Sequence, residues 1–396
     1  MVRINSSWVK FFHVIYLVAW GVTDLTKGYL YENYKYLFWA VPIGLAALIF
    51  WENGCKIKKE TLVFREHLIY CLFFIAVSVV AIFVNEHLVF DLRDVMRMIF
   101  ALIYGFLLLN TDDTENKDFY VDTLFIACIV VLIFRFRSEF SIAQLLTIDF
   151  LDSYSPFEHH LAHEFAFYFF YYYRRKKTGR VLLSVLLSYV TLKRIHILAI
   201  VLILVLGPFL KKIKVTNGLI NFAKVCFFLS PVLMDFLVSP IFVNWFDSTF
   251  EVSFYQFTMS RVNQMDLLLN YEGSLLGLQG VDQFLRSNKK GVILCHSDII
   301  RLYLETTIVG LALYVNAFFN MLKQNRDIYA FAAMLLMFVS MFASVNLQRP
   351  HTYLMIYLIC CIDFEAAARE DELSLLNRES RKRFSSFSLR RGVSAH

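Results

Sequence analysis

The chain has 396 residues, of which 58% are hydrophobic, against about 45–50% in typical soluble domains. It contains 41 Phe and 21 Tyr, and its formal net charge is +6. Apolar runs of membrane-spanning length recur from end to end, which excludes a single soluble core. The sequence also has no P-loop, dinucleotide-binding fingerprint or internal repeat, so nucleotide-binding and solenoid classes are not indicated.

Twelve apolar stretches are expected to cross a membrane as helices. The first, around "FFHVIYLVAW", is followed by no small-residue cleavage site, so we expect an anchor and not a removed signal peptide. The sequence therefore predicts an all-α, polytopic integral membrane helical bundle with both termini on one side, although ten or eleven crossings stay open because several runs are short. The stretches lie near residues 8–23, 35–51, 68–85, 98–110, 119–134, 157–173, 181–192, 197–210, 219–239, 302–322, 328–346 and 350–363.

Basic clusters orient these stretches. "CKIKKETLVFR", "YRRKKTGR", "KKIK", "KQNR" and the tail "RESRKRFSSFSLRR" fall on one side, which the positive-inside rule makes cytoplasmic. The acidic loop "NTDDTENKD" fits this side poorly. Residues 1–363 are expected to form one membrane domain, and the polar residues 364–396 a loose cytoplasmic tail.

Two loops on the opposite side are unusually long. They cover residues 135–164 and about 240–300, and long loops are commonly functional or disordered. The stretch "NWFDSTFEVSFYQFTMSR" is too aromatic for a disordered segment, so we expect short helices there. Most of the seven cysteines lie inside apolar runs and only Cys295 lies in the long loop, where we expect it to be exposed. No disulfide framework is indicated.

The first candidate site is the segment 181–210, which basic clusters flank at both ends. A single helix would place Lys193 and Arg194 near the bilayer centre, at a cost of about 2.5–3.5 kcal/mol each. A hairpin with "TLKRIH" at its apex avoids that cost, but its arms are shorter than the hydrocarbon core. Lys193, Arg194 and His196 are therefore either interfacial anchors in a short turn or a recessed cationic site for an anionic headgroup.

The second candidate site is "SRVNQMDLLLNYEGSLLGLQG". Arg261 begins a stretch in which apolar residues recur at helical spacing up to "NYEG", where glycine suits the end of a helix. Gly277 and Gly280 then predict a second turn. Most loop arginines are solvated, but the planar fork of a guanidinium suits phosphate oxygens.

The third candidate site is "CHSDIIRLYLETTIVGLALYV", in which Ser297 is expected to cap a helix that begins near Asp298. Asp298, Arg301 and Glu305 are spaced i, i+3 and i+7, so they share one helix face and can pair. His296 lies just before this helix. A lone histidine is more often structural than catalytic, but its reference pKa of about 6.5 leaves a neutral base for removing a proton from a hydroxyl.

The segment "SPFEHHLAHEFAF" is a fourth candidate. His159 and His163 would share a helix face at a spacing that can bind zinc. The second histidine of H-E-x-x-H is missing, so a metalloprotease is not supported. A structural metal, polar lining of a substrate cavity by residues such as His163, and interfacial packing remain the alternatives.

In this order, the first three sites resemble those of the bacterial O-antigen polymerase and O-antigen ligase superfamily, over roughly residues 180–320. "TLKRIHILAI" is similar to its Arg-bearing helix start, although "LKRIH" stands where Ser often precedes the arginine. "SRVNQMDLLLNYEGSLLGLQG" resembles its loop of Ser, Arg, a short helix and paired glycines. "CHSDIIRLYLETTIVGLALYV" resembles its signature of His followed by Leu, Glu and Gly.

The resemblance implies a glycosyltransferase, without metal or cofactor, at the periplasmic face of the bacterial inner membrane. It implies an O-antigen polymerase that joins undecaprenyl-pyrophosphate-linked oligosaccharides; the alternatives are an O-antigen ligase that transfers glycan to lipid A core, and a membrane transporter. The bilayer and a chain-length regulator protein are further expected partners, and nucleic acid is not. The expected catalytic residues are His296 as base and Arg261 and Arg194 as pyrophosphate contacts, and the expected substrate-binding residues are Lys193, Arg301, Glu305, Asp298 and His163.

Overall fold

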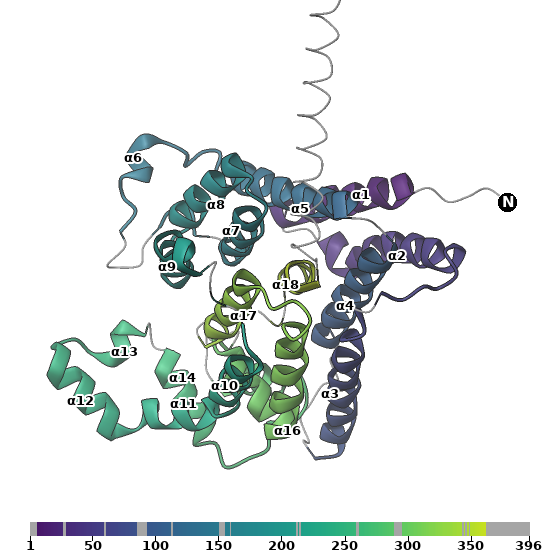
Figure 1. Cartoon of the computed structure of the whole chain (residues 1–396). Helices are drawn as coiled ribbons and strands as arrows, with labels where there is room; N and C mark the ends of the chain where they lie inside the picture. Colours follow the sequence, from purple (N-terminus) through teal and green to yellow (C-terminus); the bar gives the residue numbers. More distant parts are fainter. Residues whose placement is uncertain are drawn as a thin grey trace, which may run out of the picture. The chain divides into compact units, whose positions relative to one another are not determined.

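The computed structural model is helical through the residues that it describes, which confirms the predicted all-α class (Figure 1). The described residues are 6–361 without 27–28, 59–60, 85–92, 112–113, 150–154, 159, 211–212, 214, 259–260, 289–294, 343, 345–346 and 348. The predicted tail at 364–396, His159 and most of the basic cluster "KKIK" lie outside the described residues.

Helices form where the sequence is apolar, since each of the twelve predicted stretches contains one. These helices are α1 (Ser6–Thr26), α2 (Tyr29–Glu52), α3 (Phe64–Val84), α4 (Arg93–Thr111), α5 (Thr114–Arg135), α7 (Phe165–Arg174), α8 (Thr178–Val190), α9 (Arg194–Leu210), α10 (Asn217–Phe228) with α11 (Ser230–Val238), α16 (Asp298–Met321), α17 (Ile328–Ser340) and α18 (Pro350–Cys361). Shorter helices occupy the two long loops: α6 (Ile142–Leu145), the 3-10 helix η2 (His160–His163), α12 (Pro240–Phe250), α13 (Phe254–Phe257), α14 (Arg261–Leu269) and α15 (Gly280–Asn288).

Helix length supports a membrane protein but does not establish twelve crossings. Among the described residues, α3, residues 94–111 of α4, and α16 are long and apolar enough to span a membrane. The pair α10 and α11, bent by 44° at its break, is a fourth candidate. Other predicted spans contain shorter helices: α7 has 10 residues and α18 has 12. The predicted span at 157–173 begins with turns and η2, so its α-helix starts only at Phe165.

The exposed surface of α3 is the kind that lipid covers. Its 18-residue window has a mean hydropathy of 2.6, yet only 33% of that window is buried. Phe83, for example, is 86% exposed. In water such a surface would be an aggregation hazard, whereas in a bilayer it faces acyl chains of the same polarity.

Aromatic side chains of α16 pack against those of α3 and α18. The ring centroids of Tyr70 and Tyr314 are 5.3 Å apart, and those of Phe318 and Tyr357 are 6.0 Å apart. Tyr314 and Phe318 also contact each other at 4.7 Å. Such pairs contribute beyond the apolar area that they bury, so α16 is fixed on both sides.

Polar contacts gather the predicted cytoplasmic loops into one set. Asp118 accepts hydrogen bonds from Arg175 and Lys177, both at 2.9 Å, and Arg174 pairs with Asp327 at 2.8 Å. The acidic loop, which fits the predicted cytoplasmic side poorly by charge alone, is therefore in contact with the basic cluster "YRRKKTGR" of that predicted side. Opposite charges compensate each other across the two loops.

The remaining loops form a second set. Ser155 donates to the carbonyl of Val190 at 2.5 Å, and the backbone N–H of Leu278 donates to Ser78 at 3.1 Å. The rings of Phe140 and Phe157 stack at 4.8 Å, which joins the segment after α5 to the segment before η2. In chain order, the ends of the described long helices alternate between the two sets, as spans that cross a membrane in alternate directions require.

This alternation predicts which positions label together. Single cysteines at Ser138 and Ser287 should react with a membrane-impermeant maleimide from one side, and cysteines at Gly179 and Gln324 only from the other. All four positions are exposed, and the exposed native Cys55 and Cys226 would first be replaced by serine. The measurement is labelling of intact and permeabilised cells; Ser138 and Gly179 reacting from the same side would contradict the two-set arrangement.

Candidate functional site

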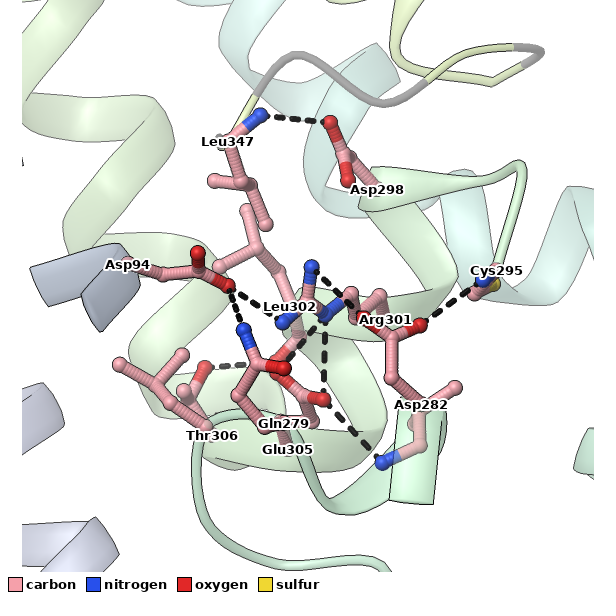
Figure 2. A network of polar contacts seen from close by, with 12 residues as sticks. Asp94, Gln279, Asp282, Cys295, Asp298, Arg301, Leu302, Glu305, Thr306 and Leu347 are labelled. Atoms are coloured by element: carbon pink, nitrogen blue, oxygen red, sulfur yellow. Dashed lines mark hydrogen bonds and ion pairs between the residues drawn. The ribbon is translucent and has the colours of Figure 1, made fainter. Parts of the chain in front are cut away.

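Arg301 is a fully buried cation near the start of α16. Its Nη2 lies 2.6 Å from Asp94 Oδ2, and its Nε donates to both carboxylate oxygens of Glu305 at 3.1 Å. Its Nη1 is 3.4 Å from Asp282 Oδ2. Because an ion taken out of water costs several kcal/mol unless it is paired, these carboxylates of α4, α15 and α16 are what allow the guanidinium to lie there (Figure 2).

The predicted turn with Gly277 and Gly280 docks on this network. The N–H of Gly277 donates to the backbone carbonyl of Glu305 at 2.9 Å, and the N–H of Val281 donates to its carboxylate at 3.1 Å. The backbone of α16 is interrupted next to Glu305, where Thr307 has φ 64° and ψ 177°. The Glu305 carbonyl can therefore accept a hydrogen bond from outside the helix. A break in α16 thus provides the place where the turn with Gly277 and Gly280 attaches.

Both glycines of this turn are required by its geometry. Gly277 has φ +92°, a conformation that L side chains rarely adopt. A Cβ on Gly280 would lie 2.5 Å from the carbonyl oxygen of Leu275, closer than real contacts allow. Between them, Gln279 donates to Asp94 at 2.5 Å and so joins the turn to α4 (Figure 2).

The same network fixes the segment that carries His296. Asp282 accepts the backbone N–H of Cys295 at 2.8 Å, and the thiol of Cys295 donates to the carbonyl of Ser297. Burial raises the pKa of this thiol to about 12. The prediction of an exposed Cys295 is therefore wrong, because its amide is tied to a buried carboxylate. His296 is exposed between two buried neighbours.

The start of α16 confirms part of the sequence interpretation. Ser297 is the N-cap residue, although its side chain makes no capping hydrogen bond. The predicted pairing of Arg301 with Glu305 is present. Asp298 is used differently, because its Oδ2 accepts the N–H of Leu347 at 2.8 Å and so fastens the segment before α18 (Figure 2).

Three predicted substrate-binding residues thus lie behind the surface. Asp298, Arg301 and Glu305 are each 0% exposed, and their described contacts are with protein groups. What they do in the structure is hold the two segments that carry His296 and the residues next to α18.

The first candidate site is a helix–turn–helix, as predicted. α8 ends at Val190 and α9 begins at Arg194, and Leu192 in the turn has φ 46°. Lys193 forms an ion pair with Glu158. His196, in the first turn of α9, is buried with its ring 5.2 Å from that of His163. The basic apex is therefore held against the segment before α7.

Arg261 begins α14, again as predicted. Val262, Met265 and Leu268 on this helix are buried, and the first two pack in a cluster with Ile300 of α16. The helical spacing of these apolar residues, visible in the sequence, is what orients α14. The guanidinium at its start is thereby held near the beginning of α16.

The predicted basic residues come together in the structure. Burial lowers the pKa of His296 below its ordinary value, and the positive charges of Arg261 and Lys193 lower it further, against an opposing effect of Asp282. Burial likewise lowers the pKa of Arg261; Glu158 opposes this, and Arg194 adds to it. These cations from three separate segments are therefore close enough for their charges to interact.

His163 joins the same group and brings in a residue that sequence reasoning missed. His163 is 8% exposed, and the charges that act on it are those of Arg349, His196, Lys193 and Arg261. Nothing in the sequence pointed to Arg349, because it is a single arginine in a short loop. Asp94, also missed, had a weak signal, because a carboxylate at the start of an apolar run is rare and calls for a partner.

The assembled site is an exposed histidine next to several cations, backed by a buried ion network. Within the described residues no group of three His, Cys, Asp or Glu side chains is placed to hold a metal ion, and His159 of the possible zinc pair lies outside them. The chain matches no protein-family model, no curated protein and no solved structure.

Removing the buried cation should destabilise the protein strongly. Arg301→Met leaves Asp94, Asp282 and Glu305 as uncompensated buried carboxylates, for which about 3–5 kcal/mol is expected. Thermal unfolding of the purified protein in detergent measures this loss. The control is Arg286→Met at an exposed arginine of α15, expected to change stability by less than about 0.5 kcal/mol. Equal unfolding temperatures for the two variants would contradict a central role for the network.

Proposed function

We propose that the protein is an O-antigen polymerase, a membrane glycosyltransferase that joins undecaprenyl-diphosphate-linked repeat units at the periplasmic face of the bacterial inner membrane. The observation that carries the proposal is the grouping of exposed His296 with Arg261, Lys193 and Arg194. A base next to several cations, at the ends of apolar helices, suits a substrate that combines a hydroxyl, a diphosphate and a lipid tail.

The proposal includes twelve crossings with the basic loops in the cytoplasm. The alternation of helix ends between two loop sets supports it, and so does the positive-inside rule. The short helices would then span together with the turns and 3-10 segments that extend them, as irregular backbone is tolerated in a membrane where protein surrounds it. The candidate site falls on the periplasmic side, with the set that contains 135–164 and 240–300.

The chemistry follows from the leaving group. The acceptor hydroxyl oxygen forms a bond to the anomeric carbon of the donor while the bond from that carbon to the diphosphate oxygen breaks. Negative charge develops on the lipid diphosphate, and Arg194 and Arg261 stabilise it. His296, neutral at the start, takes the hydroxyl proton. The growing glycan thus passes from its lipid carrier to the terminal sugar of another lipid-linked unit.

The buried residues have supporting roles in this proposal. Arg301, with Asp282 and Glu305, holds the segment of His296, and Asp298 holds the segment before α18. Lys193 is balanced by Glu158 and lies at the rim of the site. His163 lies beneath the cations, where its ring contacts His196.

The proposed catalytic residues should be needed for long glycans. His296→Ala, Arg194→Ala and Arg261→Ala should each leave lipopolysaccharide with core plus a single repeat, because the base or a phosphate contact is lost; each loss is worth about 10²–10³-fold in rate. Gel separation of lipopolysaccharide from cells that carry only the variant measures this.

The control for these variants is Arg137→Ala, at an exposed arginine of the same loop set. It should leave the ladder of glycan lengths intact, and membrane levels of all variants should equal that of the wild type. Normal ladders from all three site variants would overturn the assignment. Bare core without any repeat would instead identify an O-antigen ligase, which uses the same donor.

The pH dependence should report the cations around His296. Because the neutral imidazole is the active form and its pKa is lowered by burial and by the charges of Arg261 and Lys193, the acid limb of kcat/KM should lie at lower pH than an ordinary histidine would give. Lys193→Gln should move this acid limb to higher pH, since removing a nearby positive charge makes protonation easier. A pH profile with a synthetic donor measures both, with Arg137→Gln as control. An acid limb that Lys193→Gln shifts to lower pH would contradict His296 as the base.

A further inference from the structure

Arg349 is held in place by the start of α16. Arg349 directly precedes α18 and lies two residues after Leu347. The N–H of Leu347 donates to Asp298 at 2.8 Å. The N–H of Ile299 also donates to the carbonyl of Met341, at the other end of the same loop. The segment between α17 and α18 is thus fastened at both ends to the first turn of α16, the helix that also anchors His296.

Contacts connect this segment to Arg194. His351, two residues after Arg349, has its Nδ1 3.9 Å from Glu164 Oε1. The preceding residue, His163, stacks edge-on against His196 with ring centroids 5.2 Å apart. His196 lies in the first turn of α9, which Arg194 begins. The start of α18 is therefore joined through the segment before α7 to the start of α9.

Arg349 lies near groups of both charges. Arg349 is partly buried, and burial lowers its pKa to about 10 even though Glu164 and Asp298 raise it. It therefore keeps its charge at neutral pH. Its charge acts on His163, as do those of Lys193 and Arg261. Because these three cations act on the same residue, a multiply charged anion that binds there can interact with them together.

We propose that Arg349 binds the diphosphate of the lipid-linked donor together with Arg194 and Arg261, that Glu164 is its counter-ion while the donor is absent, and that Asp298 is its positioning residue. This inference rests on the proposed function, because the diphosphate is the donor's. It gives the site a cation from a further segment of the chain, the one directly before α18.

Because Glu164 is the proposed counter-ion, the inference predicts a variant that gains affinity as well as one that loses it. Arg349→Gln should weaken the binding of undecaprenyl diphosphate by about tenfold, because one charge-assisted contact is lost. Burial raises the pKa of Glu164 to about 7, so binding is compared at pH 8, where this carboxyl group is ionised. Glu164→Gln should then tighten binding by about two- to fivefold, because the carboxylate that competes for Arg349 becomes neutral. Arg349→Lys keeps the charge without the planar fork and should fall between Arg349→Gln and wild type.

Asp298 provides a second, independent variant pair. Asp298→Asn keeps an oxygen that can accept the N–H of Leu347, so binding should stay within about twofold of wild type. Asp298→Ala removes this acceptor and should weaken binding, with KM for the donor rising more than kcat falls. A residue that mattered only for folding would lower both the yield and kcat of the protein without this selective change in KM.

The experiment measures binding of undecaprenyl diphosphate to the full chain in nanodiscs of zwitterionic phosphatidylcholine, which adds no net anionic charge. Inorganic diphosphate serves as competitor, to separate recognition of the diphosphate from recognition of the lipid. Arg137→Gln is the matched control, since it removes an exposed arginine from the same loop set. Thermal unfolding of each variant shows that it is folded.

The results separate the two proposals. Weaker binding and weaker diphosphate competition in Arg349→Gln, with tighter binding in Glu164→Gln, supports the inference. Loss of binding in Arg194→Gln and Arg261→Gln, with wild-type affinity in both Arg349→Gln and Glu164→Gln, overturns the inference and leaves the proposed function standing. Absence of binding in the wild type overturns both.

Discussion

The buried charge of Arg301 is the constraint on which the rest of the site depends. A guanidinium inside an apolar bundle must be paired, and the chain pairs it with Asp94, Asp282 and Glu305 from three helices. Two of these carboxylates, Glu305 and Asp282, also accept the backbone amides of Val281 and Cys295 in the long loop. The same carboxylates therefore compensate the buried charge of Arg301 and position the loop.

From this follows a division between a rigid scaffold and an exposed site. Asp282 of α15 fastens the segment that ends at His296, and Asp298 in the first turn of α16 fastens the segment that ends at Arg349. The cations Arg194 and Arg261 come from helix starts whose own apolar residues hold them. In the proposed function, the groups that face the substrate differ from the groups that place them, so a donor with a diphosphate and a long lipid would bind without disturbing the buried network.

Apolar runs were sufficient to predict where the helices lie, and the cost of burying Lys193 and Arg194 was sufficient to predict the turn between α8 and α9. The paired glycines also predicted a turn correctly. The partners of Arg301 could not be predicted, because Asp94 is 207 residues away and a sequence does not show which distant carboxylate will face a cation. The burial of Cys295 could not be predicted for the same reason, since its amide is held through a tertiary contact.

The central claim is that a base and several cations, brought together from separate segments, act on one lipid diphosphate. Its most direct test incubates the purified protein with a synthetic undecaprenyl-diphosphate repeat unit, in the presence of a metal chelator, and separates the products by size. The account predicts a ladder of glycans still attached to the lipid carrier, together with released undecaprenyl diphosphate. Unchanged repeat units, from protein that is folded and binds the donor, would contradict it.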